Sequence, residues 1–359
     1  MRNIIAQFAT RNEIGDIRPL KIGHINDSFI VESKIKGDES YFLQKINHHI
    51  FKNIEGLQKN IQIVTDHIRA KLIEAGELNN ERKVLQLVKT NDGKLFYKDI
   101  DGGFWRMYVN IENTHSYEKI TPELAFKAGE SFGNFQCMLA DISHNELIET
   151  LPNFHNMEFR LEQFREAVRA NIASRLTKSQ WLVDEIEKRA DEMCQPERLF
   201  RDGLLPKRIN HCDTKINNLL FDENDDPICI VDLDTVMPGF VLSDFGDFMR
   251  TAANNRAEDD IDLSKTGVNL EIFEAYTRGY LKKVTFLSQI EIDNLAFGAK
   301  LLSYMQTVRF LGDYLNGDTY YKIQSPDHNW QRSLSQFLLL QSQEENYEIM
   351  KQIVLDCCK

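Results

Sequence analysis

Long hydrophobic runs are missing from this sequence of 359 residues. No stretch approaches the roughly 20 apolar residues that a membrane-spanning helix needs. Residues 1–7 carry neither a long apolar run nor a small-residue cleavage site, so they do not resemble a secretion signal. The six cysteines form no C-x-x-C pair, which argues against a disulfide framework or a zinc site. We therefore expect a cytoplasmic protein with no membrane partner.

Positive charge is outnumbered, because 43 Lys and Arg against 55 Asp and Glu give a formal net charge of -12. A surface of that sign repels phosphate backbones, so we expect no nucleic-acid partner. A phosphate-binding G-x-x-x-x-G-K-[ST] loop is absent as well: Gly93 and Lys94 are followed by Leu95, and no glycine stands at the required distance before them. The P-loop enzymes are thereby excluded.

The order of the hydrophobic patterns predicts an α+β protein. Short apolar runs separated by turn residues indicate strands in the first third of the chain, at 18–22, 28–33, 41–46, 84–88, 94–98 and 104–111. Later segments repeat apolar residues at steps of three and four, as in Ala125, Ala128, Phe132, Phe135 and Leu139, which is typical of a helix with one buried face. A hairpin signal interrupts the helical part at 217–234. We predict a β-rich N-terminal lobe over 1–111 and a mainly helical C-terminal lobe over 112–359.

The segment from His211 to Asn218 has the form H-x-D-x-K-x-x-N, which favours phosphoryl transfer. That reaction requires little covalent chemistry from the protein, which must orient an acceptor hydroxyl and hold magnesium against the phosphates. Asp213 is the candidate base for the hydroxyl proton. Lys215 can offset the charge of the transferred group, and Asn218 is a neutral oxygen ligand for Mg²⁺. We therefore predict a kinase that transfers the γ-phosphate of ATP to a hydroxyl of a small molecule.

A D-x-D pair follows at the distance of one hairpin. Asp232 ends an apolar run, and Mg²⁺ prefers one or two carboxylates together with phosphate oxygens and waters. On a strand, Asp234 would point to the same side as Asp232 and is a candidate second ligand. Asp244-Phe245-Gly246 also spells a metal-binding tripeptide of protein kinases. Because it precedes a helical stretch, we interpret Asp244 as a helix N-cap or a buried brace for the catalytic loop.

These motifs resemble those of the aminoglycoside phosphotransferase and choline kinase superfamily, which is related to the protein kinases. The chain is most similar to the bacterial N-acetylhexosamine 1-kinases. The matching blocks are Gly23–Asn26, Gly102–Arg106, His211–Asn218, Val231–Gly239, Asp244–Asp247, Arg309–Asp318 and His328–Asn329. They extend over nearly the whole chain.

The resemblance implies a two-lobed protein-kinase-like fold, ATP and Mg²⁺ as cofactors, and phosphorylation of the anomeric hydroxyl of N-acetylglucosamine or N-acetylgalactosamine. It implies that Gly23, His24 and Asn26 belong to the loop over the phosphates. It also implies that the backbone near Val109 and Ile111 holds the adenine. The superfamily's strand lysine is expected where this sequence has Gln44, followed by Lys45. Either Gln44 is a neutral contact, or a bulge turns Lys45 inward.

Arg309 lies among apolar neighbours on a predicted helix, where a charge is costly unless it is paired. One interpretation is an ion pair with Asp313 at i+4. The other, favoured by the resemblance, is that Arg309 and Tyr314 or Tyr320 contact the sugar.

Two other functions remain open. A kinase for an amino alcohol, an aminoglycoside or another sugar would need an acidic pocket if its substrate were cationic. Its candidate residues are Asp141, Glu258, Asp259 and Asp260, for which a solvated surface position is the simpler interpretation. A kinase-like binding module without turnover has no physical need for Asp213, Asn218 and Asp232 together.

Overall fold

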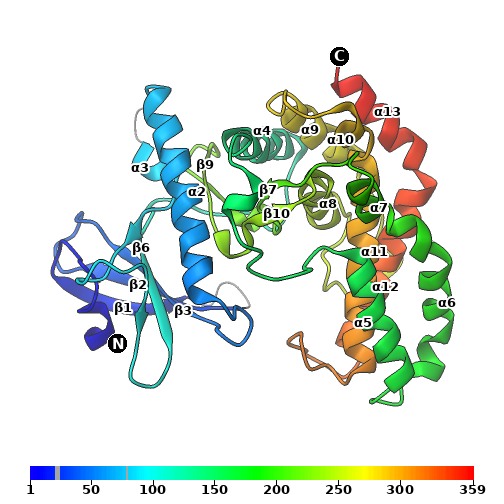
Figure 1. The fold of residues 1–359 in the computed structure, drawn as a ribbon, viewed down its shortest axis with the longest axis horizontal. Coiled ribbons are helices and arrows are strands. Elements are labelled where there is room, and N and C mark those ends of the chain that lie inside the picture. Colours follow the sequence, from blue (N-terminus) through cyan, green and yellow to red (C-terminus); the bar gives the residue numbers. More distant parts are fainter. Residues whose placement is uncertain (21–24, 78–79) are drawn as a thin grey trace. The chain divides into compact units, whose positions relative to one another are not determined.

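The structure, a computed structural model, describes residues 1–20, 25–77 and 80–359. It divides into two units, each discontinuous in sequence (Figure 1). The first comprises Met1–Ser116, Asn145–Leu151 and Leu219–Met237, and the second comprises Tyr117–His144, Pro152–Asn218 and Pro238–Lys359. The predicted α+β class is confirmed. The predicted lobe boundary after residue 111 is continuous in sequence, unlike these units, and it stays a prediction.

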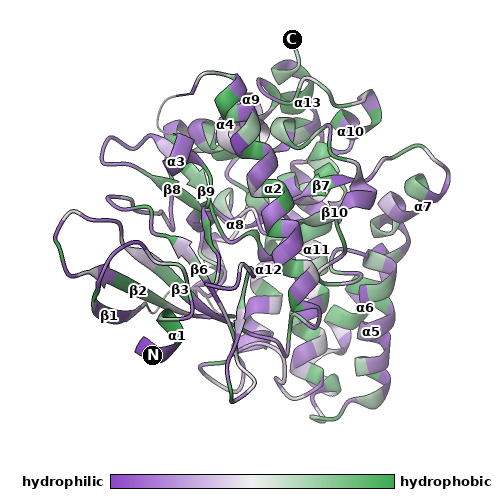
Figure 2. Cartoon of the chain, turned by 60° about the vertical axis from the view of Figure 1, so that its left-hand side comes forward, coloured by the Kyte–Doolittle hydropathy of each residue, from purple (hydrophilic) through white to green (hydrophobic). Residues whose placement is uncertain are grey.

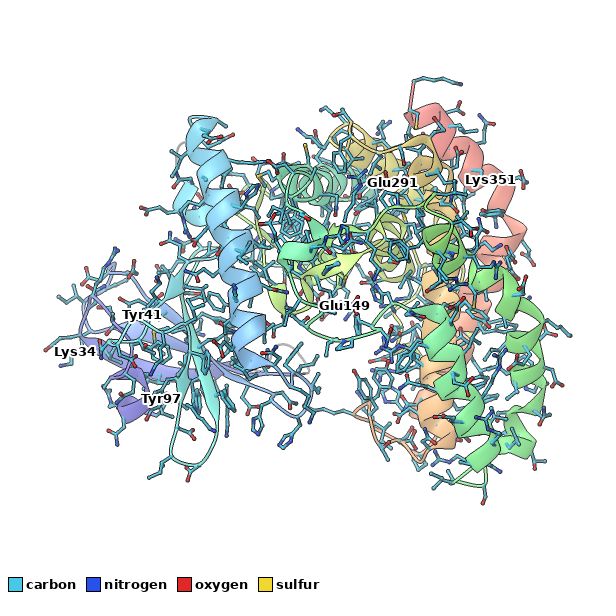
Figure 3. All side chains as sticks on the ribbon, viewed as in Figure 1. Lys34, Tyr41, Tyr97, Glu149, Glu291 and Lys351 are labelled. Carbon is cyan, nitrogen blue, oxygen red and sulfur yellow. The ribbon has the colours of Figure 1, made fainter. Side chains whose placement is uncertain are left out.

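The first unit is built on an antiparallel sheet with the strand order β1-β2-β3-β6-β4, and β5 also pairs with β6. The strands are β1 (Ile14–Leu20), β2 (Asp27–Ser33), β3 (Tyr41–Ile46), β4 (Leu87–Val88), β5 (Tyr97–Lys98) and β6 (Phe104–Val109). One face of this sheet is apolar, and its core includes Tyr41, labelled in Figure 3, with Leu43, Trp105 and Met107. Because side chains alternate along a strand, the neighbouring residues lie on the opposite face.

Helices α1 (Arg2–Ile5), α2 (Ile54–Glu74) and α3 (Asn80–Lys83) complete the N-terminal part of this unit. Asn53 caps α2 by accepting a hydrogen bond from the Gly56 N–H. The predicted apolar face of this helix, which includes Ile61, Val64 and Ile68, is buried. The helix therefore has one buried apolar face, and hydrophilic and hydrophobic residues alternate along it in Figure 2.

The predicted hairpin within 217–234 is present as β8 (Leu219–Phe221) and β9 (Pro227–Ile230). The register pairs Leu219 with Ile230. After β9 the chain forms a short 3-10 helix, η3 (Leu233–Thr235), and then β10 (Met237–Gly239), which pairs with β7 (Arg208–Asn210). This hairpin separates the two stretches of sequence that carry the predicted catalytic and metal residues.

The second unit is helical. Its helices are α4 (Pro122–Met138), α5 (Met157–Ala170), α6 (Leu176–Met193), α7 (Gln195–Arg201), α8 (Val241–Ala252), α9 (Leu270–Leu281), α10 (Gln289–Asp293), α11 (Leu295–Leu315), α12 (His328–Glu345) and α13 (Tyr347–Cys357). Short 3-10 turns are η1 (His144–Glu146), η2 (Ile216–Asn218) and η4 (Leu263–Lys265). The apolar stripe predicted between Ala125 and Leu139 is buried in α4 and at its C-terminal end.

Helices α8 and α11 cross at very short range, and this crossing fixes the helix that supports the catalytic loop. A methyl group on Gly246 would lie 2.1 Å from the carbonyl oxygen of Gly298, and one on Gly298 would lie 2.0 Å from that of Leu242. Both positions therefore require glycine. In the described part of the chain, no helix is both long and apolar enough to cross a membrane.

Candidate active site

The predicted catalytic loop begins where β7 ends, and a single carboxylate fixes its shape. Asp244, in the first turn of α8, accepts hydrogen bonds from the backbone N–H groups of His211 (2.7 Å) and Cys212 (2.8 Å). The Thr214 hydroxyl donates to the Asp244 carbonyl oxygen. Cys212 has a positive φ of 62°, so the loop turns sharply here. Burial raises the pKa of Asp244 to about 7. Of the two interpretations of Asp244, the buried brace for the loop is confirmed and the helix N-cap is wrong, because Phe240 occupies the N-cap position of α8.

Asp213 stands on this loop in contact with the other two residues of the predicted catalytic set. Lys215 Nζ lies 2.9 Å from Asp213 Oδ1, and Asn218 Nδ2 donates to Asp213 Oδ2 (3.1 Å) and to its backbone oxygen (2.8 Å). Burial by itself would raise the pKa of Asp213, but the Lys215 ammonium outweighs it and holds the pKa below its usual value. The carboxylate in turn raises the pKa of Lys215. Asp213 is therefore ionised and oriented, as a group that accepts a proton must be.

A buried ion pair lies close to this loop. Arg250 on α8 contacts Asp247 Oδ1 at 2.9 Å and also pairs with Glu258. Asp247 contributes to raising the pKa of Lys215. Glu258, one of the candidates for an acidic pocket, is thus neutralised by an arginine. Asp259 pairs in the same way with Arg332.

Asp232 and Asp234 are not arranged as the alternation along a strand predicts. Strand β9 ends at Ile230, Asp232 adopts a left-handed conformation (φ 58°, ψ 55°), and Asp234 lies in η3. Because the backbone turns here, the period of two no longer applies, and that part of the prediction is wrong. Asp234 Oδ2 accepts a hydrogen bond from Asn26 Nδ2 (2.7 Å), and its Oδ1 is paired with the Arg106 guanidinium.

Magnesium would suit the chemistry of the predicted donors. The Asn218 amide nitrogen donates to Asp213, so the Asn218 side-chain oxygen is the atom left for a metal. Asp232 offers a carboxylate, and both are hard oxygen donors of the kind that Mg²⁺ prefers. Over residues 1–20, 25–77 and 80–359 no group of three or more His, Cys, Asp or Glu side chains could hold a metal ion.

The residues predicted for the nucleotide belong to the first unit. Gly23 and His24 lie outside the described residues. Asn26 accepts a hydrogen bond from the Asn47 N–H at 3.0 Å. Val109 ends β6, with its N–H bound to the Gln86 carbonyl oxygen, and Ile111 follows two residues later. The binding roles of these residues stay predictions.

The strand that carries Gln44 and Lys45 is regular, because its register with β2 and with β6 shows no shift. A bulge that would turn Lys45 inward is therefore not present. The Lys45 ammonium lies 5.7 Å from the centre of the Trp105 ring, on the apolar face of the sheet. Gln44 lies on the other face, where its Oε1 accepts from the guanidinium of Arg106 at 3.0 and 2.7 Å. Sequence reasoning did not assign a role to Arg106, although it belongs to one of the matching blocks.

The residues predicted for the sugar separate into two groups in the second unit. Arg309 on α11 donates to Gln306 at 3.1 Å, and its guanidinium lies over the rings of Phe154 (5.1 Å) and Tyr320 (5.8 Å). Tyr314 belongs to another group: its hydroxyl donates to Asp327, and the Arg175 guanidinium lies 4.3 Å from its ring centre. Of the two predicted tyrosines, Tyr320 is the one near Arg309, and the ring of Tyr321, which was not predicted, lies nearer still at 5.6 Å.

The alternative of an ion pair between Arg309 and Asp313 is wrong. The Asp313 carboxylate instead accepts backbone N–H groups from Thr319 (2.9 Å), Tyr320 (2.9 Å) and Tyr321 (3.0 Å), and it also accepts from Asn329 (2.9 Å). Those bonds hold the segment after α11, including Tyr320. Asp313 is therefore part of the scaffold.

Two residues beside Arg309 were missed by sequence reasoning. Arg160 on α5 donates to the Phe154 carbonyl oxygen and to Gln163, and burial followed by the charge of Arg309 lowers the pKa of Arg160 to about 10. Burial, with both arginines nearby, lowers the pKa of His155 to about 3, so His155 is neutral at pH 7. Among the described residues neither Arg160 nor Arg309 has a carboxylate at ion-pair distance. Only their spacing in three dimensions identifies this group.

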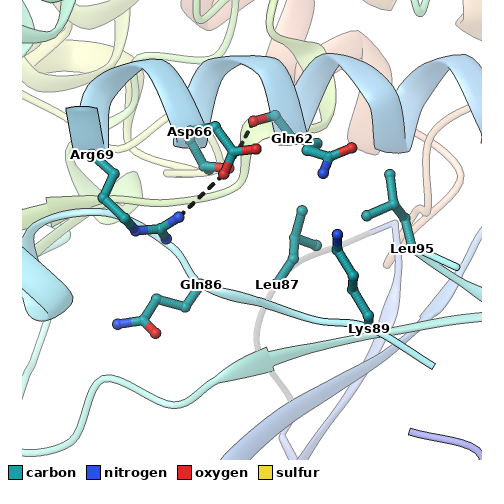
Figure 4. Close-up of a pocket in the computed structure, with 8 residues that line it drawn as sticks. Gln62, Asp66, Arg69, Gln86, Leu87, Lys89 and Leu95 are labelled. Carbon is teal, nitrogen blue, oxygen red and sulfur yellow. Dashed lines mark hydrogen bonds and ion pairs between the residues drawn. The ribbon is translucent and has the colours of Figure 1, made fainter. Parts of the chain in front are cut away.

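The pocket drawn in Figure 4 lies elsewhere in the first unit. It has a volume of about 190 Å³ and is lined by side chains of α2 and of the segments around β4, including Asp66 and Arg69, which form an ion pair of 3.2 Å. None of the predicted site residues lines it. It is therefore a separate polar hollow.

The fold is that of small-molecule phosphotransferases. An aminoglycoside phosphotransferase from Alicyclobacillus acidocaldarius matches with a TM-score of 0.64 at 12% identity, over 99% of this chain and 96% of that chain. A choline kinase from Cryptosporidium parvum matches with a TM-score of 0.55 at 13% identity, over 95% and 92%. A spectinomycin phosphotransferase solved with ADP and spectinomycin matches with a TM-score of 0.53 at 14% identity, over 96% and 94%. At these identities the likeness establishes the fold.

Membership of a family follows from the sequence. Residues 16–281, well over half of the chain, match the phosphotransferase enzyme family. The chain belongs to that family, and its expected relation to aminoglycoside phosphotransferases and choline kinases is thereby confirmed.

Proposed function

We propose that this phosphotransferase transfers the γ-phosphate of ATP to the anomeric hydroxyl of N-acetylglucosamine or N-acetylgalactosamine. The arrangement of Asp213, Lys215 and Asn218 on one braced loop supports phosphoryl transfer. The observation that carries the choice of substrate is the group around Arg309, because its charges match an uncharged sugar with a strong hydrogen-bond acceptor. ATP as the donor is further supported by ADP in the related spectinomycin phosphotransferase.

In this proposal each loop residue has one task. Asp213 accepts the proton of the sugar hydroxyl, since its carboxylate is ionised and held from both sides. Lys215 offsets negative charge on the transferred phosphoryl group. Asn218 and Asp232 would hold Mg²⁺, which when bound neutralises charge on the phosphate oxygens. The proposed work of the protein is therefore to position and to stabilise charge.

Sugar recognition is assigned to Arg309, Arg160 and Tyr320. An acetamido group presents a carbonyl oxygen, which accepts hydrogen bonds from a guanidinium. Both arginines are half-buried and have no carboxylate partner among the described residues, so acceptors supplied by a ligand would offset the cost of removing their charge from water. The aromatic rings of Phe154 and Tyr320 add apolar surface of the kind that packs against sugar rings.

A cationic substrate fits the same residues poorly. Three of the four acidic candidates are already paired with arginines, Glu258 with Arg250, Asp259 with Arg332, and Asp260 with Arg256 at 3.2 Å, and the fourth, Asp141, is exposed. A kinase of choline, amino alcohols or aminoglycosides is therefore the second candidate, favoured only by the fold of its relatives. A kinase-like binding module that does not catalyse phosphoryl transfer would have no need for an ionised Asp213.

The test is a panel of acceptors with magnesium and ATP: N-acetylglucosamine, N-acetylgalactosamine, glucose, galactose, choline and an aminoglycoside. We expect kcat/KM for N-acetylated sugars to exceed that for plain hexoses by about tenfold to a hundredfold, because a buried donor without its partner costs about 1–3 kcal/mol. Equal use of glucose and N-acetylglucosamine would contradict the sugar assignment. Preferential use of choline or the aminoglycoside would favour the second candidate.

The Arg309→Ala variant refines this test. We expect the KM for the sugar to rise strongly while the KM for ATP stays nearly unchanged. Arg175→Ala is the matched control. Like Arg309, Arg175 lies over a tyrosine ring, but that ring belongs to Tyr314, which is not in the group around Arg309. An Arg309 variant that raises the KM for ATP as much as that for the sugar would contradict the role in sugar binding.

A further inference from the structure

The turn that carries Asp232 is not held by the strand that precedes it. Strand β9 ends at Ile230, and Asp232 has left-handed backbone angles directly before η3. What fixes η3 therefore contributes to the position of Asp232. A carboxylate that binds a metal must be held in place by surrounding contacts, because small displacements weaken coordination.

Side chains from distant parts of the first unit fix this turn. The Thr150 hydroxyl donates to the Asp234 carbonyl oxygen at 2.9 Å, and Asn60 Nδ2 donates to the Val236 carbonyl oxygen at 3.0 Å. Asn26 donates to Asp234 Oδ2 at 2.7 Å. The remaining oxygen of that carboxylate, Oδ1, is paired with the guanidinium of Arg106.

Arg106 is the centre of this network and is almost completely enclosed, with 1% of its surface exposed. It lies on β6 directly opposite Gln44 of β3, and Gln44 Oε1 accepts from both Nε and Nη2. Gln44 Nε2 donates in turn to the Ser28 hydroxyl at 3.0 Å. Burial works against the charge of Arg106, but the Asp234 carboxylate outweighs it and raises the pKa of Arg106. The guanidinium therefore stays charged and is held at a fixed angle by two strands.

We propose that Arg106 is a positioning residue for the metal carboxylate: its ion pair with Asp234 fixes the turn on which Asp232 stands, and Asp234 is an anchor rather than a second magnesium ligand. Both oxygens of Asp234 are already engaged by donors, and a cation beside a carboxylate competes with Mg²⁺ for it. Asp232 remains the carboxylate for the metal. This inference rests on the proposed magnesium- and ATP-dependent function.

The two roles of Asp234 predict opposite effects of removing the arginine. If Asp234 is an anchor, Arg106→Gln releases the turn, and metal affinity falls by about tenfold to a hundredfold, as for other residues that orient a metal ligand. If Asp234 is itself a ligand, the same change frees its carboxylate, and metal affinity stays equal or rises. The direction of the change in metal affinity therefore distinguishes an anchor from a metal ligand.

The experiment measures Mn²⁺ binding by electron paramagnetic resonance in the presence of a non-hydrolysable ATP analogue and without sugar. This readout does not depend on turnover or on the identity of the acceptor. Asp232→Asn is the reference for loss of a ligand. We expect Arg106→Gln to weaken Mn²⁺ binding, Arg106→Lys to restore part of the affinity, and Asp234→Asn to lose less than Asp232→Asn.

Two further variants keep the test valid if Arg106→Gln folds poorly. Gln44→Met retains the volume and the charged Arg106 but removes the oxygen that orients it, so it should weaken Mn²⁺ binding without removing the ion pair. Arg208→Gln is the matched control: Arg208 forms a bidentate pair (2.5 and 2.8 Å) with the buried Glu291, labelled in Figure 3, in the second unit. It should lower Tm and leave Mn²⁺ affinity unchanged.

Unchanged or tighter Mn²⁺ binding in Arg106→Gln, with weak binding in Asp232→Asn, would overturn the positioning role. A loss in Asp234→Asn as large as that in Asp232→Asn would overturn the anchor role of Asp234. If Asp232→Asn itself binds Mn²⁺ as the unaltered protein does, the metal assignment of the proposed function fails instead.

Discussion

The brace formed by Asp244 gives the protein a specific dependence of stability on pH. Its carboxylate is buried and accepts two backbone N–H groups of the catalytic loop. Burial raises its pKa to about 7, whereas an unfolded chain has a value near 4. The folded state therefore binds a proton that the unfolded state has released between about pH 4 and pH 7.

The direction and the size of the change in the free energy of unfolding follow from this difference in pKa. Because the folded state holds more protons in that window, the free energy of unfolding falls as the pH rises from about 4 to 7. A shift of about three units at about 1.4 kcal/mol per unit gives a loss of at most about 4 kcal/mol. The position of Asp244 in the first turn of α8 favours the anion, which makes this figure an upper bound.

The Asp244→Asn variant removes the titratable carboxyl group and keeps the shape of the side chain. At pH 5 the Asp244 carboxyl is mostly protonated, and its hydroxyl oxygen can still accept the second loop N–H, whereas the amide NH2 group cannot, so the variant should be less stable at pH 5 by about 1–3 kcal/mol. Since only the unaltered protein loses stability with rising pH, the gap between the two should narrow toward pH 8. Its dependence on magnesium should not change, because Asp244 braces the loop.

Urea denaturation of both proteins at several values from pH 4.5 to pH 8 measures the gap directly. The control is Asp222→Asn, since Asp222 also accepts two backbone N–H groups (2.9 Å each) but lies in a solvent-exposed turn. Those bonds lower the pKa of Asp222, so its contribution is lost only as the pH falls through that lower pKa, below this window. A gap that is constant or widens with pH would refute the reasoning, and a changed magnesium requirement would refute the brace role.

Other predictions concern catalysis. Asp213→Asn should lower kcat by about a hundredfold or more and leave ATP affinity nearly unchanged, since only the proton acceptor is lost; steady-state kinetics with near-full activity would disprove the base role. Gln44→Ala should raise the KM for ATP more than Lys45→Ala does, because Gln44 shares its face of the sheet with Arg106 while Lys45 lies over Trp105. The reverse order in the same kinetics would show that the nucleotide lies on the Lys45 face.

Local sequence patterns predicted the features that depend on nearby residues. The apolar stripe from Ala125 to Leu139 predicted α4 because the period of a helix is set by its own backbone. The spacing within His211–Asn218 predicted that Asp213, Lys215 and Asn218 come together, since all three belong to one short loop. The strands at 84–88 and 94–98 were predicted too long, because only two residues of each pair with neighbours.

The sequence by itself therefore determined the α+β class and the catalytic loop, which depend on residues close together in the chain, whereas the choice between a helix N-cap and a brace for Asp244 depended on its contacts with His211 and Cys212 more than 30 residues away. Only the tertiary structure decided that Arg106 and Gln44 pair with each other, that Asp234 is bound by Arg106, and that Arg160 lies beside Arg309. These partners are far apart in sequence, and burial makes their charges depend on which groups the fold places around them. No local periodicity records such pairings.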